Sequence, residues 1–146
     1  MSCDTDNYKK QEIRDLYHVL YANRKKEGQS HQQAKRYAMD IASLRFGISN
    51  DRVRLILYDK ESTPSNYKTF IYQNNLIIIK SLQELLEFYQ KTKDTYRSIL
   101  NDMEESDEGV DIIQTKEMHL DIKIKKYTRI IEAIKEVNDF YSGEHR

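Results

Sequence analysis

Four side chains near the middle of the sequence have the hydrogen-bonding groups needed to recognise a nucleobase: Ser49, Asn50, Asp51 and Arg54. An arginine can bond guanine O6 and N7 together, and an asparagine can bond adenine N6 and N7 in the same way. Arg54 is therefore the main candidate for contact with a base edge, and Asn50 is the second. Asp51 would repel phosphate, so these residues also suit an ordinary helix start, where a carboxylate complements the helix dipole.

Three further cations, Lys35, Arg36 and Arg45, precede this group. Such side chains bond phosphate oxygens and hold register without choosing a sequence. The net charge is zero, but residues 1–60 carry 12 Lys and Arg against 8 Asp and Glu, while residues 61–146 carry 12 against 16. A basic first part and an acidic second part are expected of a chain whose first part binds nucleic acid.

Patterns for other chemistry are missing from the sequence. It has no Gly-rich phosphate loop, serine elbow or Cys-His pair. One cysteine, Cys3, gives no disulfide framework and favours a cytoplasmic protein. The histidines are scattered without a second ligand at metal spacing; they are His18, His31, His119 and His145. We expect neither an enzyme nor a bound metal or cofactor.

The acidic stretch at residues 104–109 invites a comparison with calcium loops. An EF-hand loop starting at Asp102 would need glycine at its sixth position and glutamate at its twelfth. Asp107 and Ile113 occupy those positions. The stretch is therefore interpreted as a solvated connection between helices.

The elements that position the polar residues lie between Met39 and Tyr58. This segment predicts two short helices joined by a tight turn at Gly47-Ile48-Ser49. Gly47 can adopt the left-handed conformation that ends a helix, and Ser49 is a preferred N-cap for the next one. The side chains expected to pack between the two helices are Ala42, Phe46, Ile48, Val53 and Ile56.

This segment resembles the helix-turn-helix of bacterial and phage DNA-binding proteins, in which a small residue, a glycine and a branched residue recur at this spacing. Ser43, Gly47 and Val53 carry the resemblance, although alanine is usual where Ser43 stands. The resemblance covers about a seventh of the chain. It implies that the helix over 50–58 enters the major groove of DNA. The alternative is a helical turn with a purely structural role.

The flanking sequence completes a predicted tri-helical core within residues 1–66. Apolar residues recur at helical spacing from Tyr8 to about Lys26, and Ser30-His31-Gln32-Gln33 is a capping box for a helix that runs to Phe46. After a break around Pro64, two strand-like runs within residues 67–80 surround an asparagine-bearing turn. They predict a β-hairpin, the wing of a winged helix. The alternative is that residues 76–79 begin the next helix.

Residues 81–146 predict a long antiparallel helical hairpin. One helix is expected from the capping box at Ser81 to Met103, and the other from Ile112 to Tyr141, with apolar residues repeating every seven positions. The hairpin offers a surface for self-association. The residues proposed for it are Leu82, Leu85, Tyr89, Tyr96, Ile99, Leu120, Tyr127, Ile131 and Ile134.

The sequence thus predicts a mainly all-α protein with a helix-turn-helix core, a short wing and a helical hairpin. Its expected function is sequence-directed binding of double-stranded DNA as a regulator that forms a homo-oligomer. One alternative is a phage small terminase subunit, which shares only this layout. Another is a helical adaptor that binds a protein partner through the hairpin and no nucleic acid. No apolar run approaches the roughly 20 residues of a membrane span.

Overall fold

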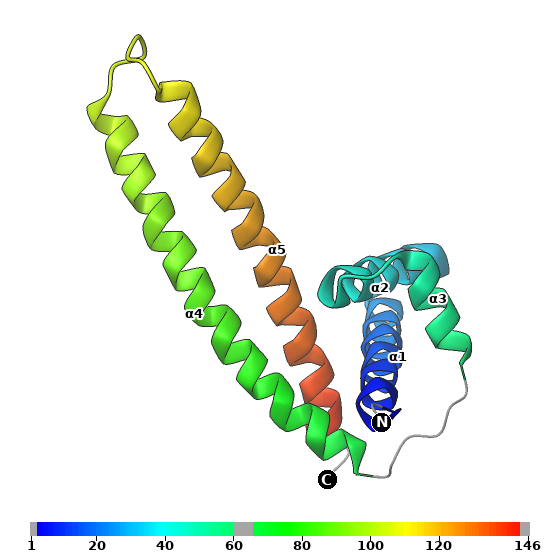
Figure 1. Ribbon diagram of the computed structural model, residues 1–146. Coiled ribbons are helices and arrows are strands. Elements are labelled where there is room, and N and C mark those ends of the chain that lie inside the picture. The colour runs from blue at the N-terminus through cyan, green and yellow to red at the C-terminus, as the bar shows by residue number, and fades with distance from the viewer. Residues whose placement is uncertain (1–2, 60–65, 144–146) are drawn as a thin grey trace. The chain divides into compact units, whose positions relative to one another are not determined.

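The computed structural model describes residues 3–59 and 66–143, and within them it contains five helices and no strand. Figure 1 shows their order along the chain. The helices are α1 (Cys3–Lys26), α2 (His31–Phe46), α3 (Asn50–Tyr58), α4 (Tyr67–Asp102) and α5 (Val110–Gly143). The mainly all-α prediction is therefore confirmed for the described residues.

Local sequence signals fix the ends of α2 and α3 as predicted. Ser30 and Gln33 form a reciprocal capping box at the start of α2. Gly47 ends α2 with φ 66° and ψ 34°, and Ser49 caps α3 by accepting a bond from the backbone N–H of Arg52. The Ser43 hydroxyl donates to the carbonyl of Ile48, so the residue that replaces the usual alanine stabilises the turn.

The predicted β-hairpin over residues 67–80 is wrong, because this segment forms the first part of α4. The helix expected to start at Ser81 starts instead at Tyr67. Ile71, Asn75 and Ile79 are buried at intervals of four residues, which is a helical period. The apolar run that suggested a strand includes Leu76 and Ile77, and both are exposed on other faces of the same helix.

The chain divides into two compact units. One comprises residues 1–78 and 132–146, and the other comprises residues 79–131. These boundaries differ from the predicted divisions at 66 and 80, because the last part of α5 packs with α1 to α3 and the start of α4.

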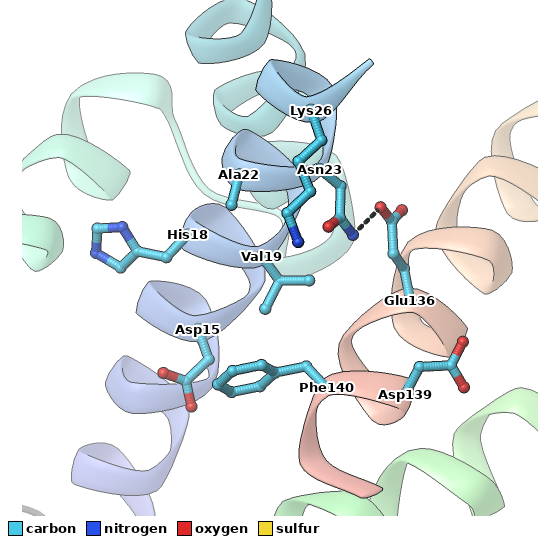
Figure 2. Close-up of a pocket in the computed structure, with 9 residues that line it drawn as sticks. All are labelled: Asp15, His18, Val19, Ala22, Asn23, Lys26, Glu136, Asp139 and Phe140. Atoms are coloured by element: carbon cyan, nitrogen blue, oxygen red, sulfur yellow. Dashed lines mark hydrogen bonds between the residues drawn. The ribbon is translucent and has the colours of Figure 1, made fainter. Parts of the chain in front are cut away.

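The C-terminal part of α5 is tied to α1 by polar contacts. Figure 2 shows Asn23 of α1 donating to Glu136 of α5, at 2.6 Å. Arg24 forms an ion pair with the same carboxylate, also at 2.6 Å. The Tyr141 hydroxyl donates to Asp15 at 2.8 Å. The first unit therefore depends on residues from both ends of the sequence.

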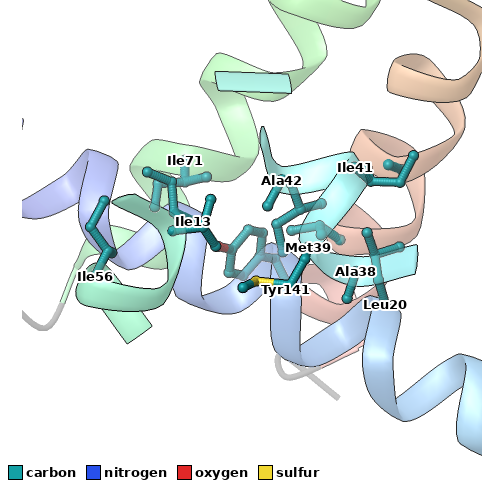
Figure 3. Close-up of a cluster of buried hydrophobic side chains, with 13 residues drawn as sticks. Ile13, Leu20, Ala38, Met39, Ile41, Ala42, Ile56, Ile71 and Tyr141 are labelled. Carbon is teal, nitrogen blue, oxygen red and sulfur yellow. The ribbon is translucent and has the colours of Figure 1, made fainter. Parts of the chain in front are cut away.

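The core of the first unit is shown in Figure 3. Tyr141 is fully buried among aliphatic side chains from all five helices of the unit. The buried members of this cluster are Ile13, Leu16, Leu20, Ala38, Met39, Ile41, Ala42, Val53, Ile56, Ile71, Ala133, Val137 and Tyr141. Val53 and Ile56 attach α3 to this core, so the opposite face of α3 is left to solvent.

The second unit is a hairpin built from α4 after residue 78 and α5 up to residue 131. Tyr89 stacks on Tyr127, with ring centroids 6.1 Å apart. Ion pairs join Lys93 to Asp121 at 2.9 Å and Arg97 to Glu117 at 2.8 Å. None of the helices in the described part of the chain has the length and apolar character needed to cross a bilayer.

Candidate nucleic-acid interface

An open groove of about 580 Å³ separates the exposed sides of α2 and α3. Lys35 and Arg36 line it from α2, and Asn50 and Arg54 line it from α3. The groove thus brings together four of the seven residues predicted to contact DNA. Three of them are cations, and Asp40 is the one carboxylate among the lining residues, so the groove is suited to an anion. Gln32 and Met39 complete its wall.

Arg54 is placed by the short helix that carries it. Val53 and Ile56 are buried, so Arg54 faces outward and its side chain is 56% exposed. Its guanidinium forms an ion pair with Asp51 across one turn, at 3.1 Å. The pair is exposed, so it contributes little to stability and leaves the guanidinium free to exchange partners. Asp51 also lies in the first turn of α3, where a carboxylate complements the helix dipole.

Ser49 and Asn50 form the start of α3. The Ser49 hydroxyl is occupied by its capping bond to the Arg52 N–H, at 3.1 Å. The Asn50 amide lies 3.5 Å from Asp40, at the limit of a hydrogen bond. Sequence reasoning did not single out Asp40, although it follows Arg36 by one helical turn and so shares its face. Ser49 keeps its O–H donor and Asn50 its amide oxygen for an external partner.

Arg45 does not line this groove. Its guanidinium forms an ion pair with Glu12 of α1 at 3.5 Å and lies over the Phe46 ring, 4.7 Å from the centroid. Burial lowers the pKa of Arg45 and raises that of Glu12, and the charge of each partner opposes its neighbour's shift. Arg45 thus connects α2 to α1 and lies apart from Lys35 and Arg36, with which it was grouped as a phosphate contact.

Two apolar residues on the exposed face of α3 were not among the predicted site residues. Leu55 is 65% exposed and Tyr58 is 77% exposed. The signal for them was present in the sequence: they do not share the period of Val53 and Ile56, so they fall outside the buried face.

A second hollow, of about 520 Å³, lies between α1 and the end of α5 (Figure 2). Val19, Ala22 and Phe140 supply its apolar wall, while three carboxylates and two basic residues surround it. The carboxylates of Glu136 and Asp15 are already bonded within the chain. Across the described residues, no three His, Cys, Asp or Glu side chains are grouped as a metal site requires.

Most of the residues predicted to mediate self-association pack against other parts of the same chain. Ile131 and Ile134 are buried, and the others are half-buried, except Ile99. Other apolar side chains of the second unit are exposed instead: Phe88, Ile112, Met118 and Ile122.

Comparisons with protein-family models, with curated proteins and with solved structures found no match for this chain.

Proposed function

We propose that the protein binds double-stranded DNA through α3, with Arg54 reading a base in the major groove and Lys35 and Arg36 holding the phosphate backbone. The observation that carries this proposal is the groove between α2 and α3, in which Lys35, Arg36, Asn50 and Arg54 converge. The left-handed turn at Gly47 and the cap at Ser49 set the geometry between these helices.

The proposed recognition divides the residues by task. Arg54 exchanges its ion pair with Asp51 for two bonds to guanine, and Asn50 has the groups to bond adenine. Lys35 and Arg36 bind phosphate and supply affinity that falls with added salt. Asp51 opposes phosphate close to α3, so it disfavours non-specific contact by the recognition helix while leaving the two cations of α2 available.

One small helix contacts only a few base pairs, so we further propose that the protein self-associates to reach two half-sites. The exposed apolar side chains of the second unit are the basis for this step, with Phe88 and Ile99 on α4 as the clearest pair. The proposed role is that of a regulator.

The test uses the full-length protein and duplexes selected by it from a random library. Arg54→Ala should reduce affinity for the selected duplex by about 1–3 kcal/mol and have little effect on random DNA. Lys35→Ala should weaken binding to both duplexes alike and lower the slope of log affinity against log salt by about one unit.

Lys116→Ala is the matched control, because Lys116 is an exposed cation of α5 in the second unit, outside the groove. It should leave both affinities close to those of the unmodified protein. If the protein retarded no duplex at low salt, the DNA-binding proposal would fail, and a protein-binding adaptor would become the leading function. If Arg54→Ala left both affinities unchanged, α3 would not be the recognition helix.

A further inference from the structure

The exposed face of α3 carries an apolar side chain directly beside the arginine proposed to read DNA. Leu55 follows Arg54 in sequence and lies one turn after Asp51, so these three side chains share the outward half of the helix. The inward half is accounted for by Val53 and Ile56, which are buried in the core. Leu55 is left 65% exposed.

An exposed leucine at this position has no role in the core of the first unit. Leu55 does not itself line the groove, but it follows Arg54, which does, and Tyr58 is the other exposed apolar residue of α3. Two side chains on a nine-residue helix form a patch far smaller than the roughly 800 Å² that each partner contributes to a stable protein interface. Because Arg54 connects this small apolar patch to the cationic groove, we expect a small apolar target within a polyanion.

The major groove of DNA contains one apolar group of this size, the 5-methyl group of thymine. From these placements we infer that Leu55 is a specificity-determining residue that packs on a thymine methyl group, within about two base pairs of the base read by Arg54. This inference rests on the proposed DNA-binding function and adds to it a named element of the target sequence. Asn50 and Arg54 discriminate by hydrogen bonds, whereas Leu55 discriminates by contact with a methyl group.

The experiment replaces each thymine of the selected duplex, one at a time, by deoxyuridine. This change removes only the methyl group and leaves base pairing intact. One position, or two adjacent positions, should lose affinity by about 4-fold, the value expected from ~0.8 kcal/mol for one buried methyl-sized group. Leu55→Ala should abolish that sensitivity, so that the variant binds the thymine and deoxyuridine duplexes equally.

Lys35→Ala is the matched control: it should weaken binding to both duplexes while preserving the ratio between them. Leu55 is exposed, so Leu55→Ala should keep the helical circular dichroism and melting temperature of the unmodified protein, which excludes misfolding.

Three results would overturn the inference while leaving the DNA-binding function in place. They are a bound duplex with no deoxyuridine-sensitive position, a sensitive position that Leu55→Ala leaves sensitive, and an equal loss by Leu55→Ala on both duplexes. If no duplex were bound at all, the inference and the proposed function would both fail.

Discussion

Gly47 is the residue on which the connection between α2 and α3 depends. Its φ of 66° lies in the left-handed region, and its N–H donates to the carbonyl of Ser43, which closes the last turn of α2. A Cβ added at this position would meet no atom within 4 Å. Any cost of a side chain at Gly47 therefore comes from the backbone conformation and not from a clash.

Gly47→Val should lower the free energy of unfolding by at least ~1 kcal/mol, because a β-branched side chain is strained at positive φ. Chemical denaturation monitored by circular dichroism measures the change. Gly47→Asn is the control, since asparagine tolerates the left-handed conformation and should cost less. Equal stability of the valine variant and the unmodified protein would show that Gly47 does not hold this conformation in solution.

Asp15 is a second residue whose environment has a measurable consequence. It accepts hydrogen bonds from Tyr141 at 2.8 Å and Gln11 at 2.9 Å, yet burial raises the pKa of its carboxyl above the ordinary 3.8. At a pH just above 3.8, Asp15 is therefore protonated more often in the folded state than in the unfolded state. The contribution of Asp15 to stability must therefore fall as the pH rises through its folded pKa.

Asp15→Asn removes this titration and keeps an oxygen that can accept the bond from Tyr141. The stability of the unmodified protein relative to the variant should be greatest near pH 4 and should decrease as the pH rises toward neutrality. Thermal unfolding of both proteins across this range provides the comparison. The pKa of Glu12 is raised by burial and, in smaller part, by the charge of Asp15, so Asp15→Asn reduces that rise and the change at Glu12 adds to the difference in the same direction. Parallel curves for the two proteins would contradict the assignment.

At the scale of elements, α2 and α3 were predictable because their ends carry local signals, whereas α1 begins at Cys3, five residues before the Tyr8 start that its apolar period indicated. The capping box at Ser30, the glycine at 47 and the cap at Ser49 act through neighbouring backbone atoms, so they could be identified without knowledge of the tertiary structure. The groove residues were predicted for the same reason. Lys35, Arg36, Asn50 and Arg54 follow directly from the faces of two correctly placed helices.

The first part of α4 was mispredicted because its helical period includes a polar residue. The buried face is marked by Ile71, Asn75 and Ile79, and an asparagine in the middle of such a series hides the pattern. Asn75 is only 1% exposed and donates to Asn138 of α5 at 2.9 Å, while Asn138 donates to the carbonyl of Tyr72 at 3.2 Å. This pairing joins residues distant in sequence, so no local signal could reveal it.

Arg45 was misplaced for a related reason. Arg45 follows Arg36 by nine residues, about two and a half helical turns, so it lies on the opposite side of α2, where its partner Glu12 comes from α1. A sequence pattern shows which face a cation occupies and does not show whether another helix covers that face. Leu55 and Tyr58 were overlooked because exposed apolar residues on a helix look like core residues until their faces are compared with those of Val53 and Ile56.

At the scale of the whole molecule, the first unit is closed by the C-terminal part of α5. Ala133, Val137 and Tyr141 are buried in the same cluster as Ile13 and Ile71. A fragment ending near residue 65 would lack these contacts and would leave the apolar surface of α1 exposed. Truncation therefore cannot separate DNA binding from self-association, and point substitutions in the full chain are required.

The last prediction concerns Phe88 and Ile99 on α4, which are 62% and 40% exposed. They are separated by 11 residues, or about three helical turns, and so lie on one side of α4. We expect this side to contact a second copy of the chain, since burial of the exposed parts of the two side chains would contribute a fraction of the roughly 1.5–3 kcal/mol gained by burying a fully exposed one. The double variant Phe88→Lys with Ile99→Lys should therefore be monomeric by light scattering at concentrations where the unmodified protein is a small oligomer.

The matched control is Gln90→Lys with Ser98→Lys, which adds the same charge at two exposed polar positions of α4 and should keep the oligomer. The monomeric variant should still bind a single half-site through the groove residues, but it should lose the added affinity for paired half-sites, because that gain depends on linkage of two binding units. If the unmodified protein were itself monomeric, or if the Phe88 and Ile99 variant kept its mass, this side of α4 would not be the interface. If the Phe88 and Ile99 variant kept its mass, the exposed side chains of α5 would be the next candidates for the interface: Ile112, Met118 and Ile122.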